Sequence, residues 1–383
     1  MRRVALLGST ALFGAGMITN SALAADGIKL GVGGFFRSAY MATFDDDSEG
    51  ELGNDRNTDG LFSDAEVHFE GSTTLDNGLT VGAHVELEGE NSNDQIDEAW
   101  AYFSGGFGEV RVGSQDDALA GACILPPGGT TNFSAFSPNQ WGANNDAFAA
   151  GFPALTSNAA CVGVDDKEDA QKLVYITPNF GGFQLALSYT PNGGDEDQID
   201  GVGPHVGMPI NEDEESRHNV AAYATYQYEG DGWGLDAGAG GSFEGHVEKS
   251  PGPDRDKQQF YQADVNLTFG QFSVGGVFEY YNNLATFDTG DNVDAWVAGG
   301  GVAYTMDAWT FGAQYSHQLA DVDGSSDDFT MDRAVVTANY ALGPGIDLDG
   351  EVGYTWLDTD PETADNVDDY QGLEVGIGTA ITF

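Results

Sequence analysis

The chain has 383 residues, of which 62 are acidic and 13 are lysine or arginine, so its formal net charge is −49. Lysine and arginine are the residues that contact phosphates, so this balance argues against nucleic-acid binding, while the acidic field attracts cations. A surface adapted to saline surroundings would account for the charge equally well. The 55 glycines and 23 phenylalanines follow no collagen repeat and favour many short strands with tight turns.

The first 24 residues are typical of an export signal rather than of a folded segment. Arg2 and Arg3 form a short basic region, residues 4–18 are mostly apolar and small, and Ala22-Leu23-Ala24 is a small-x-small cleavage site. The apolar stretch is too short for a spanning helix, and no later stretch approaches the roughly 20 apolar residues required. We expect cleavage after Ala24, which leaves residues 25–383 with a net charge of 11 − 62 = −51.

The mature chain alternates between apolar and polar or small residues with a period of two. Near the C-terminus, Leu373 and Val375 share one face, and Glu374 and Gly376 share the other. Each run predicts a strand with one apolar and one wet face, and most runs have the roughly 9–11 residues that cross a bilayer at a tilt. The sixteen runs lie near 28–43, 62–75, 79–90, 95–104, 109–114, 171–178, 183–190, 216–229, 233–244, 258–270, 271–282, 293–306, 308–319, 328–342, 346–357 and 370–383.

Short and long connections alternate along the chain. Turns such as Asp76-Asn77-Gly78 and Gly343-Pro344-Gly345 are typical of tight hairpins. The other connections are mostly longer and acidic, such as 191–215 and 358–369, with 91–94 as the one short exception. Both termini then lie at the rim with the turns, which is the plan of a barrel with short periplasmic turns and long external loops.

Aromatic residues near strand ends favour a membrane barrel over a soluble sandwich, because they form girdles at the two membrane interfaces. Backbone groups in hydrocarbon must all be paired, so such a sheet has to close. A barrel of about sixteen strands is too wide for side chains to fill, and an aqueous channel remains. The residues assigned to the girdles are Trp100, Tyr102, Phe180, Phe183, Tyr189, Tyr226, Tyr228, Trp233, Phe269, Phe272, Tyr304, Trp309 and Phe383.

Residues 115–170 form the longest connection and contain both cysteines, Cys123 and Cys161. An even pair of cysteines in an exported protein predicts a disulfide, which would restrain the 37 residues between them. A connection this long in a compact barrel usually serves a function. It either folds into the lumen and narrows it, or lies over the mouth.

Several stretches resemble the Gram-negative general porins of the alphaproteobacterial, Rhodobacter-like type. Residues 104–117 look like that family's hairpin between strands 4 and 5, and residues 172–178 and 182–191 are similar to its strands 6 and 7. The terminal Phe383 matches the family's assembly signal. The resemblance extends over the whole mature chain and implies an outer-membrane homotrimer for passive diffusion of small hydrophilic solutes and ions. We therefore expect an all-β fold, a 16-stranded antiparallel transmembrane β-barrel with an inward-folded third loop.

The resemblance also implies acids on the third loop that face bases on the wall across a constriction. By alternation, Lys29, Arg37 and Arg111 point inward, and Arg217 is assigned with them. Opposed charges would order water and favour polar solutes. Simple solvation of a wet wall is the alternative for each residue, and Ser114, where the family often has arginine, weakens the case for anion preference. The loop acids assigned to the constriction are Asp116, Asp117, Asp146, Asp165, Asp166, Glu168 and Asp169.

Further acids on the strands also point into the lumen by alternation. They outnumber the bases, so we expect a preference for cations. These acids include Glu66, Glu70, Glu86, Glu88 and Glu374.

One acidic segment has the spacing of a calcium-binding loop. Asp55, Asn57 and Asp59 precede Gly60, and Glu66 stands at the twelfth position. Predicted strands rather than helices flank the segment, so it is either a structural calcium site or a solvated acidic loop. No cofactor is required by the expected function, and other acidic clusters could bind divalent ions that bridge lipopolysaccharide.

Other function classes stay open at this level. A substrate-specific channel would be blocked by its solute at low concentration. A structural or adhesive barrel would not conduct ions. An enzyme is not expected, because the chain has neither G-x-S-x-G nor H-E-x-x-H, and His68 and His84 are interpreted as scattered lumen residues.

Overall fold

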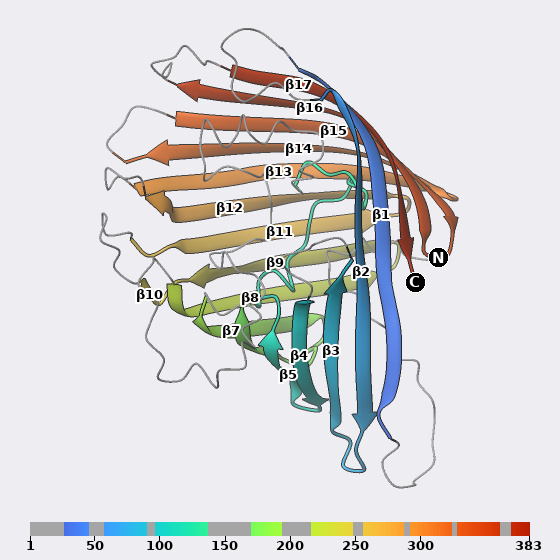
Figure 1. Ribbon diagram of the computed structural model, residues 1–383, viewed down its shortest axis with the longest axis vertical. Coiled ribbons are helices and arrows are strands. Elements are labelled where there is room, and N and C mark those ends of the chain that lie inside the picture. Colours follow the sequence, from blue (N-terminus) through green and yellow to red (C-terminus); the bar gives the residue numbers. More distant parts are fainter. Residues whose placement is uncertain are drawn as a thin grey trace.

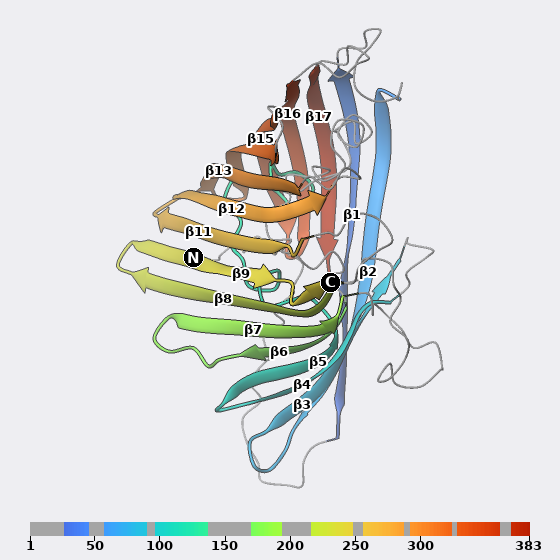
Figure 2. The same ribbon diagram turned by 90° about the vertical axis from the view of Figure 1, so that its left-hand side faces the viewer.

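The computed structural model shows one antiparallel sheet that curls until its first and last strands pair, so the wall is closed (Figures 1 and 2). Residues 1–24, the predicted export signal, lie outside the described residues. Within the described part, no helix is long and apolar enough to cross a membrane. The described residues are 27–45, 57–89, 96–136, 170–193, 216–247, 256–286, 292–323, 328–360 and 369–383.

The strands follow the alternating runs of the sequence, and, with the two-residue β10 set aside, each pairs with its neighbours in chain order. They are β1 (Lys29–Asp45), β2 (Asp59–Thr74), β3 (Thr80–Glu88), β4 (Ile96–Gly105), β5 (Gly108–Ser114), β6 (Gln171–Ile176), β7 (Phe183–Asn192), β8 (Ser216–Gly230), β9 (Trp233–Phe243), β10 (His246–Val247), β11 (Gln259–Phe269), β12 (Phe272–Thr286), β13 (Asn292–Met306), β14 (Trp309–Val322), β15 (Asp328–Gly343), β16 (Ile346–Asp360) and β17 (Asp369–Thr382).

Sixteen of the seventeen labelled strands make up the wall. The remaining strand, β10, has two residues and pairs with the start of β8. The rest of β8 pairs with β9. Strand β10 therefore prolongs β9 beyond a break at Glu244 and Gly245. The predicted number of wall strands is confirmed, while the predicted run 233–244 did not anticipate the break.

The barrel closes through β1 and β17. Their register runs from Phe35 opposite Thr382 to Asp45 opposite Gly372. One residue beyond the Phe35–Thr382 pair, the Gly34 amide donates to the Phe383 carbonyl (3.0 Å), and the Phe383 amide donates to the Gly34 carbonyl (3.1 Å). Closure leaves no free edge, which is the condition for a sheet in hydrocarbon, where unpaired backbone groups are costly.

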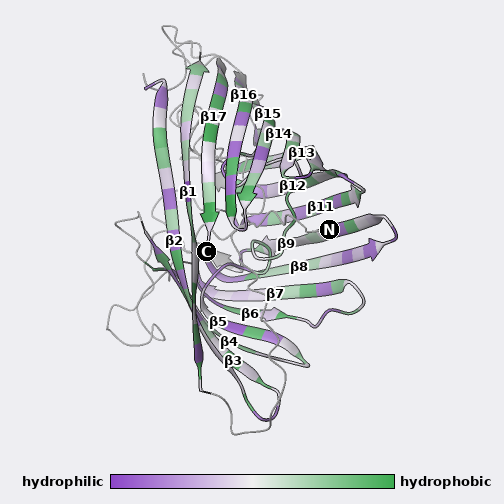
Figure 3. Ribbon diagram, turned by 90° about the vertical axis from the view of Figure 1, so that its right-hand side faces the viewer, coloured by the Kyte–Doolittle hydropathy of each residue, from purple (hydrophilic) through white to green (hydrophobic). Residues whose placement is uncertain are grey.

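The outer face of the barrel is apolar and the inner face is polar, the reverse of a water-soluble protein. On β16, Val352 and Tyr354 are exposed, whereas Asp349 and Glu351 are buried. Figure 3 shows the same alternation as bands of hydrophobic and hydrophilic colour along β16 and β17. A surface of this kind is suited to lipid outside and water inside.

Aromatic rings form a girdle at the rim with the short turns. Phe272 packs on Tyr304 and Trp309 packs on Tyr340, each pair with ring centroids 4.7 Å apart. These rings belong to neighbouring strands, so the contacts run around the barrel rather than along it. Their position is typical of a membrane interface, where amphipathic rings are enriched.

Two residues assigned to the girdles, Trp100 and Tyr102, instead face the lumen. The Tyr102 hydroxyl donates to Glu70 (3.0 Å), and the Trp100 ring stacks on His84 with centroids 5.0 Å apart. The next residue, Phe103, is exposed on the outer face. A place near the end of a strand does not decide the face; the alternation along β4 does.

Candidate functional site

The start of the long connection, residues 115–136, lies inside the barrel against the inner wall (Figure 1). It contains turns but no strand or helix. The Leu119 side chain is fully buried, and it anchors the loop in an apolar cluster contributed by five wall strands. The buried partners of Leu119 in this cluster include Tyr223, Phe260, Tyr281 and Val297.

Hydrogen bonds from wall side chains fix the path of the loop. The Gln314 amide donates to the Pro126 carbonyl (2.8 Å), and the Thr337 hydroxyl donates to the Gly128 carbonyl (2.6 Å). Asn266 donates to the carbonyl of Leu125 (2.8 Å) in the same way. Because the loop has no backbone ladder of its own, these bonds satisfy carbonyl groups that would otherwise be buried without a partner.

The loop continues around the wall as far as β1. The Asn132 amide donates to Asp349 on β16 (2.8 Å), and the fully buried Phe133 packs against Met41 on β1. Arg37, also on β1, donates to the Thr131 carbonyl (3.4 Å). Residues 115–136 therefore cross much of the inner wall and occupy part of the lumen, so the predicted inward folding is confirmed for this segment.

Glycines on the wall make room for the loop. A Cβ atom on Gly312 would lie 2.5 Å from the Cα of Gly128, and one on Gly299 would lie 2.7 Å from the Phe136 ring. Side chains at these positions would push the loop off the wall. We use the term glycine seat for the five wall glycines whose missing Cβ atoms leave space for loop residues, namely Gly299, Gly301, Gly312, Gly376 and Gly378.

The bases assigned to the constriction are spread along the wall. Arg37 donates to the described loop at the Thr131 carbonyl, and its guanidinium also pairs with Asp64 (2.7 Å). Arg111 pairs with Glu109 (2.6 Å) and lies over the Trp100 ring at 4.4 Å. Lys29 begins β1 at the turn rim, and Arg217 lies at the opposite end of the barrel, where β8 begins.

The two described loop acids have local roles at the start of the loop. One oxygen of Asp117 accepts the amides of Leu119 (2.7 Å) and Ala120 (2.9 Å), and its side chain is buried. The Asp116 amide donates to Glu98 on β4 (2.7 Å), so the loop leaves the wall beside an acid. Five other acids assigned to the constriction lie outside the described residues, namely Asp146, Asp165, Asp166, Glu168 and Asp169.

Acids dominate the buried inner face of the described strands. Lys172 and Arg333 are the two buried lysine or arginine residues there, and Arg333 donates to Glu374 (2.8 Å) and Glu351 (3.3 Å). Sequence alternation placed Glu66, Glu86 and Glu374 in the lumen. The eight buried inward acids of these strands are Glu66, Glu86, Glu98, Asp264, Glu279, Asp349, Glu351 and Glu374.

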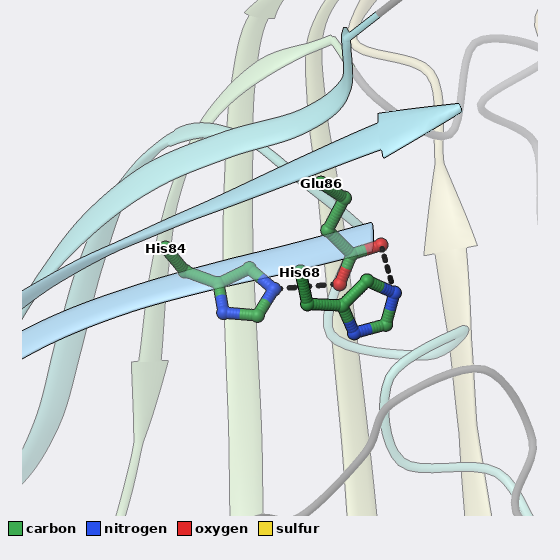
Figure 4. Close-up of side chains that lie close together, drawn as sticks. All are labelled: His68, His84 and Glu86. Atoms are coloured by element: carbon green, nitrogen blue, oxygen red, sulfur yellow. Dashed lines mark hydrogen bonds and ion pairs between the residues drawn. The ribbon is translucent and has the colours of Figure 1, made fainter. Parts of the chain in front are cut away.

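His68 and His84, interpreted from the sequence as scattered residues, lie together with Glu86 on the inner wall (Figure 4). One ligand atom from each lies within 4.8 Å of the others. The hairpin turn at Asn77 could have revealed this cluster from the sequence, because residues equally distant from the turn face each other across β2 and β3. His68 stands opposite Glu86 by this rule, and His84 lies diagonally next to them.

The calcium-loop spacing does not form one site. Asp59 and Glu66 both lie in β2, seven residues apart along an extended strand, which is about 23 Å. Asp59 accepts a hydrogen bond from Tyr40 (2.7 Å), while Glu66 contacts His68. The two acids therefore cannot ligate the same ion, Asn57 precedes β2, and Asp55 lies outside the described residues.

The Cys123–Cys161 disulfide stays a prediction. Cys123 is half-buried and packs against the cluster around Leu119. Cys161 lies outside the described residues.

Comparison with known proteins assigns the family. The family model described as Gram-negative porin matches residues 8–360. The chain belongs to the Gram-negative porin family. No curated protein sequence matches this porin.

Solved structures share the fold of this porin at low sequence identity. OmpT of Vibrio cholerae in its trimer form has a TM-score of 0.60 at 13% identity, covering 94% of this chain and 100% of that chain. The anion-selective porin from Comamonas acidovorans has a TM-score of 0.57 at 16% identity, covering 93% and 100%. A mutant of the Rh. blastica porin has a TM-score of 0.53 at 17% identity, also covering 93% and 100%.

Family and fold together fix the general role of the chain. It is a porin of the Gram-negative outer membrane, a non-enzymatic channel through which solutes diffuse passively. The polar inner wall suits a water-filled lumen, and the loop segment 115–136 occupies part of that lumen.

Proposed function

We propose that this porin is a general diffusion channel that prefers cations, and that its narrowest part lies between the loop segment 115–136 and the wall facing it. The preference is supported by the inner face. Eight buried acids, against one buried lysine and one buried arginine, point inward from the described strands. A lumen with this excess of fixed negative charge raises the local concentration of cations and lowers that of anions.

The low-dielectric barrel wall strengthens this effect, since it focuses the field of the carboxylates into the water of the channel. Glu70 and Glu88 are half-buried on the inner face and carry charge close to that water. The acids assigned to the loop would add to it. The anion-selective relative from Comamonas acidovorans has the same fold, so the selectivity of this porin has to come from its own wall charges rather than from the fold.

The test is the reversal potential of the purified porin in a planar bilayer under a potassium chloride gradient. We expect a cation-selective potential that moves towards zero in the variant Glu70→Gln. Asp307→Asn is the matched control, because it removes the same charge at the turn between β13 and β14 and should leave the potential unchanged. An anion-selective potential in the wild-type porin would refute the proposal.

We further infer that the chain forms a homotrimer of the Rhodobacter-like type in contact with lipopolysaccharide. The resemblance of residues 104–117 supports the type, and the trimer form of OmpT shows that the fold is compatible with this assembly. Conductance steps in groups of three, together with chemical crosslinking to trimers, are expected. Single steps and uncrosslinked monomers would contradict the assembly, and block by one solute at low concentration would indicate a substrate-specific channel instead.

A further inference from the structure

We propose that the inner wall binds one divalent transition-metal ion through His68 on β2 and His84 and Glu86 on β3. We call these three residues the His–Glu cluster. The hairpin between β2 and β3 places all three on the lumen side of neighbouring strands. Figure 4 shows both imidazole rings directed at the Glu86 carboxylate, one towards each of its oxygens.

The distances in the cluster suit a small ion. The Nε2 of His68 lies 3.7 Å from one Glu86 oxygen, and the Nε2 of His84 lies 2.6 Å from the other. Zinc bound to nitrogen and oxygen at about 2.0–2.2 Å in tetrahedral geometry places its ligand atoms roughly 3.3–3.5 Å from one another. The first distance is already close to this value, and the second has to widen by less than about 1 Å. An ion could therefore enter without a change of backbone.

The surroundings of the cluster are strongly acidic. Oxygens of Glu66, Glu86 and Asp97 also lie within 4.8 Å of one another. The Glu86 carboxylate contacts both histidines, which carry a positive charge only when protonated. Buried carboxylates are costly unless a positive charge compensates them, and a divalent ion supplies two.

His68 is buried within the cluster, with a relative exposure of 5%, and among the described residues its Nδ1 atom has no hydrogen-bond partner. Its Nε2 atom meets two carboxylates at once, Glu66 at 2.9 Å and Glu86 at 3.7 Å. Nε2 is the atom offered to the ion, and because it can donate only one hydrogen bond, it satisfies at most one of these two carboxylates when no ion is bound.

The donor set selects the class of ion. Two imidazole nitrogens and a carboxylate oxygen suit zinc, copper or nickel, whereas calcium and magnesium take oxygen ligands. Glu66 is placed to complete the set through its contact with His68. A bound ion would connect β2 to β3 and add positive charge to the lumen wall.

The first experiment measures zinc bound to the purified detergent-solubilised porin by equilibrium dialysis against micromolar zinc chloride and elemental analysis. We expect about one ion per chain, and zinc affinity at least about tenfold lower in His84→Gln. His218→Gln is the matched control, because His218 is an exposed histidine on β8 that bonds Tyr189 (2.7 Å) outside the cluster. It should bind zinc like the wild type.

Circular dichroism and heat-dependent gel mobility show whether each variant is folded. The zinc stoichiometry of the wild-type porin tests the proposal even if a variant does not fold. Wild-type porin without stoichiometric zinc overturns the proposal, as does equal zinc binding by folded His84→Gln. Displacement of zinc by an equal concentration of calcium would also overturn it, because it would assign the ion to the acidic set of Glu66, Glu86 and Asp97. Zinc should reduce the cation preference of the wild-type channel and leave that of His84→Gln unchanged.

Discussion

Replacing Gly312 by alanine tests whether the loop inside the barrel depends on the glycine seat. The new Cβ atom would lie 2.5 Å from the Cα of Gly128 and nearer still to the carbonyl oxygen of that residue. Carbon atoms in contact prefer separations of about 3.5–4.0 Å, so the loop has to move by about 1–1.5 Å, and the wall leaves it only the direction of the lumen. We expect a narrower channel.

The same movement weakens the bonds that hold the loop. The Thr337–Gly128 hydrogen bond (2.6 Å) and the Gln314–Pro126 hydrogen bond (2.8 Å) would both be stretched beyond normal length. Each contributes about 1 kcal/mol to stability, so up to about 2 kcal/mol of loop anchoring is at risk. We therefore expect the single-channel conductance of Gly312→Ala to be lower than that of the wild type and to fluctuate more.

The matched control is Gly350→Ala on β16. A Cβ atom there would find its nearest neighbour at 3.7 Å, an ordinary contact. Both substitutions restrict the unfolded chain in the same way, so a difference between them reports the folded state. Planar-bilayer recordings in which Gly312→Ala, Gly350→Ala and the wild type share one conductance would refute the idea that the seat positions the loop.

Two further outcomes test the interior of the barrel. Arg333→Met should lower the free energy of unfolding by about 3–5 kcal/mol in denaturant. The reason is that it leaves the fully buried carboxylates of Glu351 and Glu374 without their shared guanidinium. Unchanged stability would show that the carboxylates are compensated in another way. A peptide map of unreduced porin should contain a peptide that joins Cys123 to Cys161, and finding both peptides as free thiols would contradict the predicted disulfide.

The strands and rims could be predicted because both depend on short-range patterns. A period of two identifies a strand with two environments, and a tight turn such as Asp76-Asn77-Gly78 fixes where it ends. Irregularities in pairing leave no such pattern. The register of β3 and β4 shifts between Val85 and Leu87, so that Asp97 and Glu98 of β4 together stand opposite Glu86 of β3.

The candidate site was harder to predict because it depends on contacts between distant segments. Gly312 and Gly376 look like ordinary strand glycines until the loop is seen to lie on them. The pairing of Arg333 with Glu351 and Glu374 needs the register of three strands at once. The His–Glu cluster needed only one hairpin register, so it was within reach of the sequence.

The seam between β1 and β17 has a consequence for shortened forms of this protein. A chain cut before Gly372 would lose every backbone partner that β17 offers to β1 and all but three of those that it offers to β16. Both strands would then present a row of free amide and carbonyl groups, which recruits other chains into aggregates. Removing a dozen C-terminal residues would thus not give a slightly smaller channel. It would give an open sheet with two unpaired, aggregation-prone edges and no enclosed pore.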